Sequence, residues 1–252
     1  MARRDHRQGR RLPASKWSVA NDYHRRFAVN SAIRPKADSL AKQATHQTLH
    51  SPAFPDSLAV MNHADDAVDR WQAADGSWLE MRQMRPDDEP RVKQSLNTLS
   101  ANSRRNRFFG SIAEFSDEAV HRLVSVDPQK EYLLVVVRRE DAIEIPIAGG
   151  RFVEHEKQPE CTFSLLIGDA WQGQGIGRRL LKALLREASL RGLRTMRGDV
   201  LADNRPMLSL ARSLHFALVD SDQGDGVVQI VCDLPDAAST SWRSFVHTVL
   251  RK

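Results

Sequence analysis

A glycine-rich turn between a strand-like and a helix-like segment constrains the fold of this chain more than any other feature. The apolar run Leu165–Ile167 ends at Gly168, and the turn Gln172-Gly-Gln-Gly-Ile-Gly177 leads into a segment whose leucines recur at helical spacing. Glycine tolerates positive φ angles and lets backbone N–H groups approach a ligand closely. Such amides, together with the positive end of a helix dipole, form a site for a pyrophosphate group. Arg178 and Arg179 add positive charge at the rim of this site.

Three classes of pyrophosphate ligand compete for a turn of this kind. A nucleoside-triphosphate loop requires Gly-Lys-Ser/Thr, and the turn does not contain that triplet. A dinucleotide site requires G-x-G-x-x-G, whereas this chain has G-x-G-x-G. Asp199 lies at about the right distance to imitate a ribose-binding acid, but only 75 residues follow Gly177, too few for a complete dinucleotide fold. Coenzyme A remains as the ligand that the turn favours.

The segments on either side of the turn predict an α/β protein with a mixed sheet and helices on both faces. Residues 1 to about 75 show no sustained period of 2 or 3.6. Expected strands lie at 78–83, 132–137, 143–152, 161–167, 195–201, 217–221 and 227–233. Expected helices lie at 86–99, 116–124, 175–191 and 206–214, with one more at 239–250. Gly149 and Gly150 indicate a bulge or a close approach of another element to the second of the three central strands.

The turn and its flanks resemble a known family. Gln172-Gly-Gln-Gly-Ile-Gly177 matches the Q/R-x-x-G-x-G/A signature of the GNAT acyltransferase superfamily, and the match continues in 198–207 and 211–216. The segments Met84-Arg-Pro-Asp-Asp-Glu-Pro90 and 99–109 are similar to the opening of a bacterial branch that includes the acetyltransferase domains of protein-lysine acetyltransferases. The resemblance covers residues 78–234 and implies a mixed sheet that is splayed between its two central strands, with acetyl-CoA in the V-shaped gap.

The resemblance also implies which residues bind the donor. The amides of residues 174–178 are expected to hold the pyrophosphate, and the backbone around Leu166 and Ile167 to pair with the pantetheine arm, where one N–H polarises the thioester carbonyl. Asn204 resembles the family asparagine that contacts the cofactor, although a simple helix N-cap explains it equally well. The expected cofactor-binding residues are Leu166, Ile167, Gln172, Gly173, Gln174, Gly175, Ile176, Gly177, Arg178 and Asn204.

The residues that handle the proton depart from the family pattern. Related domains place a glutamate just before the phenylalanine of the cofactor strand, where this chain has Thr162, a residue too weak to act as a base unaided but able to order a water. Glu160 points to the same face of the strand and is the first candidate base, although a solvated carboxylate explains it too. Asp199, in an apolar strand, is the second candidate. His155 lies in a polar connection and is expected to be exposed.

Two further family positions differ. Many members use a tyrosine as general acid on the helix after the asparagine, and the corresponding residue here is Ala211. His215 stands where the family has a glycine, and a helix-terminal histidine stabilised by the dipole explains it better than a proton carrier. The cofactor site is therefore better supported by the sequence than the catalytic site.

Composition divides the chain into three parts. Residues 1–50 carry eleven Lys or Arg and three Asp or Glu, so the whole net charge of +5 originates there. We expect 1–75 to be a basic, mostly disordered extension, 78–234 the acyltransferase domain, and 235–252 a helix or tail. The basic extension is a potential nucleic-acid contact, but a functionless solvated tail explains it better.

The expected function is transfer of an acetyl group from acetyl-CoA to a primary amine, on a protein lysine or a small molecule. The alternative is a catalytically weak acyl-CoA-binding regulator, which the missing glutamate and tyrosine favour. The two cysteines, Cys161 and Cys232, lie in apolar runs, which predicts neither a disulfide nor a metal site and fits a cytoplasmic protein. A membrane span is not expected, because apolar runs are short. The sequence leaves the acceptor, the acyl length and the oligomeric state open.

Overall fold

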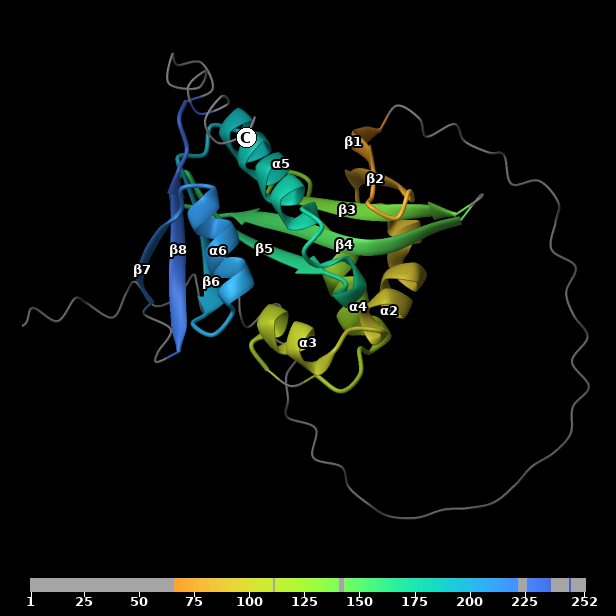
Figure 1. Cartoon of the computed structure of the whole chain (residues 1–252). Coiled ribbons are helices and arrows are strands. Elements are labelled where there is room, and N and C mark those ends of the chain that lie inside the picture. Colours follow the sequence, from red (N-terminus) through yellow and green to blue (C-terminus); the bar gives the residue numbers. More distant parts are fainter. Residues whose placement is uncertain (1–65, 111, 141–142, 222–225, 237–244, 246–252) are drawn as a thin grey trace, which may run out of the picture.

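A mixed β-sheet of eight strands runs through the centre of the structure, a computed structural model that describes residues 66–110, 112–140, 143–221, 226–236 and 245 (Figure 1). The strand order is β1-β2-β3-β4-β5-β6-β8-β7, and all neighbours are antiparallel except β5 and β6. The strands are β1 (Ala67–Gln72), β2 (Trp78–Gln83), β3 (Glu131–Glu140), β4 (Ile143–Glu154), β5 (Glu160–Ile167), β6 (Thr195–Leu201), β7 (Ala217–Asp220) and β8 (Val227–Asp233). The helices are α2 (Glu89–Asn97), α3 (Ala101–Phe108), α4 (Asp117–Val124), α5 (Ile176–Leu190) and α6 (Arg205–Ser213), with 3-10 turns η3 (Pro86–Asp88) and η4 (Asp169–Trp171).

Helix α5 forms the main hydrophobic contact with the sheet. Its apolar residues recur at positions i, i+1, i+4 and i+5, so that they lie on one face of the helix and are completely buried. These residues are Leu180, Leu181, Leu184 and Leu185. Gly150 on β4 makes the close packing possible, because a Cβ there would lie 2.7 Å from a methyl group of Leu165 and 3.3 Å from one of Leu184. The predicted close approach at Gly150 is confirmed.

Helices α2, α3 and α4 form a second, smaller hydrophobic cluster. Their shared core consists of Leu96, Leu99, Phe108, Phe115, Val120 and Val124, with Leu166 of β5 packed against it. Phe109, the C-cap of α3, has a left-handed φ of 58°, and Arg104 donates hydrogen bonds to the carbonyls of Asn97 and Ile112. This cluster places α3 beside the carboxyl end of β5 (Figure 1).

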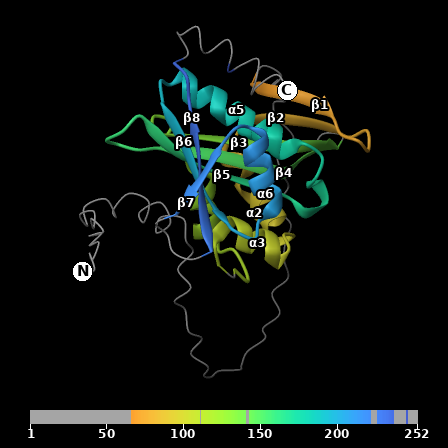
Figure 2. The ribbon, with the colours of Figure 1, turned by 60° about the vertical axis from the view of Figure 1, so that its left-hand side comes forward.

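The sheet opens between two of its interior strands, β5 and β6. β5 and β6 pair only at Glu160–Thr195, Cys161–Met196 and Thr162–Arg197, although β5 continues to Ile167 and β6 to Leu201. At the next position the ring of Phe163 lies over Gly198, where a Cβ would approach ring atoms to 2.7 Å. The strands on either side of the opening run in clearly different directions in both views (Figures 1 and 2). The splayed sheet implied by the sequence is therefore confirmed.

Two elements were not expected from the sequence. Strand β1 occupies 67–72, inside the stretch predicted as a disordered extension, and α3 lies in a stretch for which no element was assigned. The inward positions of β1 include Asp69, which binds Arg179, so the strand lacks the apolar alternation that identifies a half-buried strand. Residues 1–65 and the helix predicted at 239–250 lie outside the described residues, apart from Phe245, which packs against the main core.

The remaining strands and helices predicted between Trp78 and Asp233 are present, with shifts at their ends. The predicted helix at 86–99 begins as the 3-10 turn η3, and β3 and β4 are longer than expected. Cys161 and Cys232 are free thiols, buried in the sheet. Within the part of the chain that the structure describes, no helix is long and apolar enough to cross a membrane.

Candidate active site

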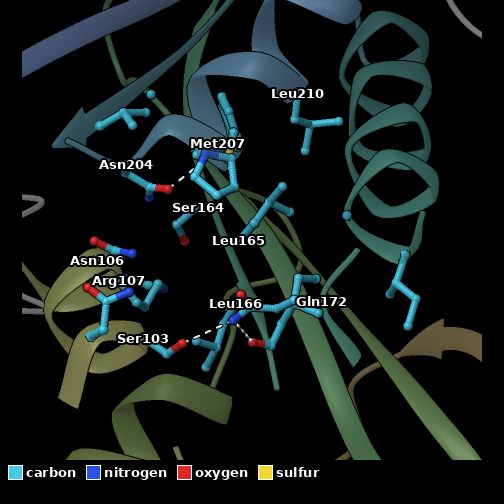
Figure 3. Close-up of a pocket in the computed structure, with 18 of the residues that line it drawn as sticks. Ser103, Asn106, Arg107, Ser164, Leu165, Leu166, Gln172, Asn204, Met207 and Leu210 are labelled. Atoms are coloured by element: carbon cyan, nitrogen blue, oxygen red, sulfur yellow. Dashed lines mark hydrogen bonds between the residues drawn. The ribbon is translucent and has the colours of Figure 1, made fainter. Parts of the chain in front are cut away.

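A cavity of about 460 Å³ occupies the opening between β5 and β6 (Figure 3). Its floor is the second half of β5, and its walls are α3 on one side and the starts of α5 and α6 on the other. Figure 3 shows Asn106 of α3, Ser164 of β5 and Asn204 at the start of α6 among the residues that line it. Residues more than a hundred positions apart in sequence thus surround one space.

The predicted glycine turn forms one end of the cavity. Gly173 and Gly175 have φ angles of 76° and 80°, which L-amino acids other than glycine rarely adopt. Gly175 is the N-cap of α5, so the amides of the first helical turn lack partners within the helix and point toward the cavity end. A helix of 15 residues adds its dipole to these donors. This end is therefore suited to bind a phosphate group.

Two arginines were predicted at the rim of the site, and one of them, Arg178, lines the cavity. The Arg178 guanidinium donates a hydrogen bond to Ser213 Oγ at 2.8 Å. Arg179 turns away toward β1, where it pairs with Asp69 at 2.8 Å and lies 4.7 Å from the centre of the Trp71 ring. Burial, followed by repulsion from these two arginines, lowers the pKa of Lys182 one turn further along α5. The first turns of α5 are thus a positively charged surface.

A network of polar bonds joins the turn to α3. Asp169, just before the glycines, accepts hydrogen bonds from Ser100 N at 2.8 Å, Ser100 Oγ at 2.7 Å and Ser103 Oγ at 2.7 Å. The Gln172 amide donates to Ser103 Oγ at 3.0 Å and to Ile167 O at 3.2 Å. Partial burial by itself raises the pKa of Asp169, but the hydrogen bonds from Ser100 and Ser103 outweigh it and lower the pKa below its usual value. The two walls of the cavity are therefore linked near the phosphate end.

Nearly all predicted cofactor residues lie together at this cavity. Those that line it are Leu166, Ile167, Gln172, Gly173, Gly175, Ile176, Gly177, Arg178 and Asn204. Gln174 lies in the turn but does not line the cavity, and its side chain donates to Ala170 O at 3.1 Å. Asn204 lines the cavity and is also the N-cap of α6, since its Oδ1 accepts from Met207 N at 3.2 Å. Asn204 is therefore a helix N-cap and is also placed where it could contact a cofactor.

The three candidate proton-handling residues lie where β5 and β6 separate. Thr162 and Asp199 line the cavity and Glu160 does not. Arg197 holds Glu160 through two hydrogen bonds of 2.9 Å, which lower the pKa of that carboxyl. Asp199 Oδ1 lies 3.4 Å from Gln229 Nε2 on β8. The structure therefore brings Thr162 and Asp199 to the inner end of the cavity, with Glu160 beside it in an ion pair.

His155 was expected to be exposed, and this prediction is wrong. The ring is half-buried at the end of β4, and Nε2 lies 2.9 Å from Thr162 Oγ1. Its backbone N–H donates to Glu160 O at 2.9 Å, which closes the connection between β4 and β5. The polar sequence of that connection concealed the contact, because the histidine faces the sheet and its charged neighbours face water.

Comparison with known proteins identifies the family. The model of the acetyltransferase (GNAT) domain matches residues 79–217, more than half of the chain. An acetyltransferase of Pseudomonas aeruginosa is 30% identical over 150 residues, covering 59% of this chain and 81% of that protein. The crystal structure of the GNAT domain of S. lividans PAT superposes with a TM-score of 0.58 at 25% identity, covering 66% of this chain and 96% of that one. The chain belongs to the GNAT acetyltransferase family.

A further relative is the acetyltransferase Pat of Mycolicibacterium smegmatis, 29% identical over 165 residues. The match covers 65% of this chain but 48% of Pat, so the similarity concerns about half of that protein. GNAT enzymes are acetyltransferases that use an acyl-CoA donor. The resemblance predicted from the glycine turn and its flanks is thus confirmed, including the similarity to Pat-type domains.

Four residues of α3 that line the cavity escaped the sequence analysis. They are Asn102, Ser103, Asn106 and Arg107, all of which line the cavity. Helix α3 has Phe108 as its only large buried apolar residue, so no apolar period identifies it. The one available signal was Ser100, whose side chain accepts from Ser103 N as an N-cap.

The C-terminal end of α6 fits the family alignment. His215 adopts a left-handed φ of 63°, the conformation in which glycine is preferred, and the amide of Phe216 returns to Ala211 O at 3.0 Å. His215 is exposed at this helix end and does not line the cavity. Ala211, at the position of the family tyrosine, is completely buried. The position of the family tyrosine therefore supplies no proton donor to the cavity in this chain.

Proposed function

We propose that this GNAT enzyme transfers an acetyl group from acetyl-CoA to a primary amine, on a protein lysine or on a small molecule. The observation that supports this most is the cavity between β5 and β6, which has a phosphate-binding turn at one end and polar side chains at the other. A donor with a pyrophosphate and a long thioester arm needs a phosphate-binding end for the pyrophosphate and a second end where the thioester can react. The interrupted ladder between the strands gives the arm a backbone to pair with.

The donor is expected to lie along the second half of β5. Its pyrophosphate would bind the amides of residues 174–178 and the charge of Arg178, while Gln172 and Gly173 shape the turn. The pantetheine arm would pair with the backbone at Ile167 and Leu166, as an added strand pairs with a sheet edge. A backbone N–H of β5 would then face the thioester carbonyl and stabilise the oxyanion that forms during attack.

The acceptor amine is expected at the inner end, near Thr162 and Asp199. An amine is mostly protonated at neutral pH, so the negative charge of Asp199 favours its approach and a proton acceptor is required before attack. Glu160 is a weak base here, because the ion pair with Arg197 lowers its pKa. The similarity to the GNAT domains of Pat-type proteins supports a protein lysine as the acceptor.

The cofactor site is tested with tryptophan variants of two glycines, one that lines the cavity and one that does not. Gly175 and Gly192 have φ angles of 80° and 79°, and a Cβ at either position would meet no atom within 4 Å, but only Gly175 lines the cavity. Tryptophan at either position therefore introduces a similar backbone strain of about 1–2 kcal/mol. We expect calorimetry to show acetyl-CoA binding for wild type and Gly192→Trp, and a loss of at least about 100-fold for Gly175→Trp.

The possible outcomes separate this proposal from the alternatives. If wild type does not bind acetyl-CoA, or if both variants bind equally, the glycine turn is a structural connection and the proposed cofactor site is wrong. If wild type binds acetyl-CoA but releases no CoA thiol with a panel of lysine peptides and small amines, the chain is an acyl-CoA-binding regulator. Ala211 at the position of the family tyrosine is the observation that favours that second candidate.

A further inference from the structure

We propose that His155 accepts the proton of the acceptor amine through the hydroxyl group of Thr162. This inference rests on the proposed function, since it assigns a positioning residue and a proton path to the same cavity. His155 does not line the cavity, whereas Thr162 does, so the histidine acts through the threonine. The pair occupies the place where the family pattern has a glutamate.

The geometry supports a relay of two groups. Thr162 Oγ1 lies 2.9 Å from His155 Nε2, and Thr162 itself borders the cavity beside Asp199. The register of β4 and β5 fixes the two residues, because Val153 pairs with Thr162 and Glu154 with Cys161. The bond from His155 N to Glu160 O, 2.9 Å long, holds the histidine backbone in place. Thr162 thus contacts the imidazole and also borders the space proposed for the substrate.

The surroundings of the imidazole keep it neutral at neutral pH. Burial is the main cause that lowers the pKa of His155 below 6.5, and the charge of Arg197 on β6 acts in the same direction. Glu160 on β5 acts in the opposite direction, but the carboxylate is paired with that same arginine. A neutral imidazole with its proton on Nδ1 accepts a hydrogen bond from the threonine at Nε2 and so can receive a proton.

The proposed proton transfer and acetyl transfer balance when water takes up and supplies the remaining protons. The acceptor ammonium group gives one proton to Thr162 Oγ1, whose own proton moves to His155 Nε2, so that the amine becomes neutral and the imidazole becomes cationic. The amine nitrogen then forms a bond to the acetyl carbon, and the bond between that carbon and the CoA sulfur breaks. The imidazolium and the product nitrogen each lose a proton to water, and the CoA thiolate takes one from water.

The two carboxylates nearby are less suited to this role. Glu160 accepts hydrogen bonds from Nε and Nη2 of Arg197 and does not line the cavity. Asp199 lies on β6, one position beyond Gly198 and across the opening from the cofactor strand. Its side chain contacts Gln229 on β8. Asp199 therefore attracts the acceptor cation, and the His155–Thr162 pair removes its proton.

The experiment measures acetyl transfer to a lysine peptide and to a small diamine between pH 5 and pH 9. His155→Gln keeps a polar group near Thr162 without a titrating ring, and Thr162→Val removes only the hydroxyl group. We expect both to lower kcat by about 100-fold or more and to leave the acetyl-CoA Kd unchanged. The limb of the pH profile with an apparent pKa below 6.5 should disappear in both variants, while Thr162→Ser should restore most of the rate.

A matched control comes from a second histidine–hydroxyl pair. His121 Nε2 lies 3.2 Å from Ser125 Oγ on α4, and neither residue lines the cavity, so His121→Gln should behave as wild type. An NMR titration of the His155 ring gives a readout that does not depend on activity, and its pKa should lie below 6.5.

The outcomes that contradict the inference differ from those that contradict the proposed function. A His155→Gln enzyme with wild-type kcat and an unchanged pH profile overturns the proton path and leaves the acetyltransferase assignment intact. A wild-type protein that binds acetyl-CoA but acetylates neither acceptor overturns both. Loss of acetyl-CoA affinity in the folded His155→Gln variant would show that the histidine shapes the cofactor site instead.

Discussion

The two walls of the cavity are built in different ways. The α5 wall is held by an apolar face of completely buried leucines against β4 and β5. The α3 wall has two buried residues, Ser103 and Phe108, and is otherwise held by polar bonds to Asp169 and to backbone carbonyls. Burial of apolar area is worth more than a few partly exposed hydrogen bonds, so the α5 wall is the more stable of the two.

This difference matches what each wall is expected to do. The α5 wall carries the phosphate-binding turn, whose amides have to stay in fixed positions for every donor molecule. The α3 wall contributes polar side chains such as Asn106 and Arg107 to the cavity. Elements with few buried apolar contacts are the ones that open and rearrange at low cost. A rigid α5 wall and a more adaptable α3 wall therefore follow from the way in which each is held in place.

Removal of apolar volume from α5 should have the largest effect on stability. Leu184 is completely buried and does not line the cavity. Leu184→Ala should lower the free energy of unfolding by about 2–5 kcal/mol, because it loses burial and leaves a cavity. Chemical denaturation gives this value, and the acetyl-CoA Kd of the folded variant should not change. A loss below about 1 kcal/mol would mean that the α5 wall is not the more stable one.

Loss of the Asp169 charge should lower stability by an intermediate amount, and the loss should be confined to α3. Asp169→Asn replaces a carboxylate that accepts three hydrogen bonds, which should cost about 1 kcal/mol at this exposed site. Hydrogen exchange should become faster in α3 and not in α5, and the acceptor KM should rise about fivefold. An equal increase of exchange in both helices would contradict the comparison.

The same variant has a pH signature. Because the folded-state pKa of Asp169 is lowered from 3.8, its contribution to stability is present above that pH and is lost as the pH falls through the folded pKa. The difference in stability between wild type and Asp169→Asn should therefore be constant from neutral pH down to about pH 4 and shrink below it. A difference that is largest in acid would show that the serine hydroxyls do not stabilise the ionised carboxylate.

The ion pair between Arg105 and Asp203, which crosses the opening, should contribute least to stability. Arg105 of α3 lies 2.9 Å from Asp203, between β6 and α6, and both side chains are substantially exposed. A double-mutant cycle with Arg105→Ala and Asp203→Ala should give a coupling free energy of about 0.2–1 kcal/mol that decreases with added salt. A salt-independent coupling above about 1.5 kcal/mol would indicate that α3 is fixed as firmly as α5.

The sequence predicted the donor side of the molecule well. Leucines at helical spacing placed α5, the glycines with positive φ placed the turn, and Asn204 marked the start of α6. Each of these signals is local, because periodicity, left-handed glycine and side-chain caps act within one helix or turn. The position of the opening was also predictable, although only through the family resemblance.

The features that the sequence analysis missed depend on contacts that no local pattern encodes. Helix α3 is polar and is fixed by Asp169, some 66–69 residues further along the chain. Strand β1 carries Asp69 on its inward face because Arg179, 110 residues away, binds it. His155 meets Thr162 only after β4 and β5 pair in the observed register. Polar contacts between distant residues are decided by the tertiary structure, so they appear only once the fold is known.

The short ladder between β5 and β6 has a consequence for the protein without its donor. After Thr162 and Arg197 the two strands continue without pairing to each other, which leaves two strand edges in the middle of a sheet instead of at its margins. Exposed edges are templates for association with other extended chains, and most proteins protect them with charges, bulges or covering elements. A pantetheine arm in the gap would cover these edges for as long as it is bound. Release of the donor would uncover hydrogen-bonding groups of the backbone inside the sheet.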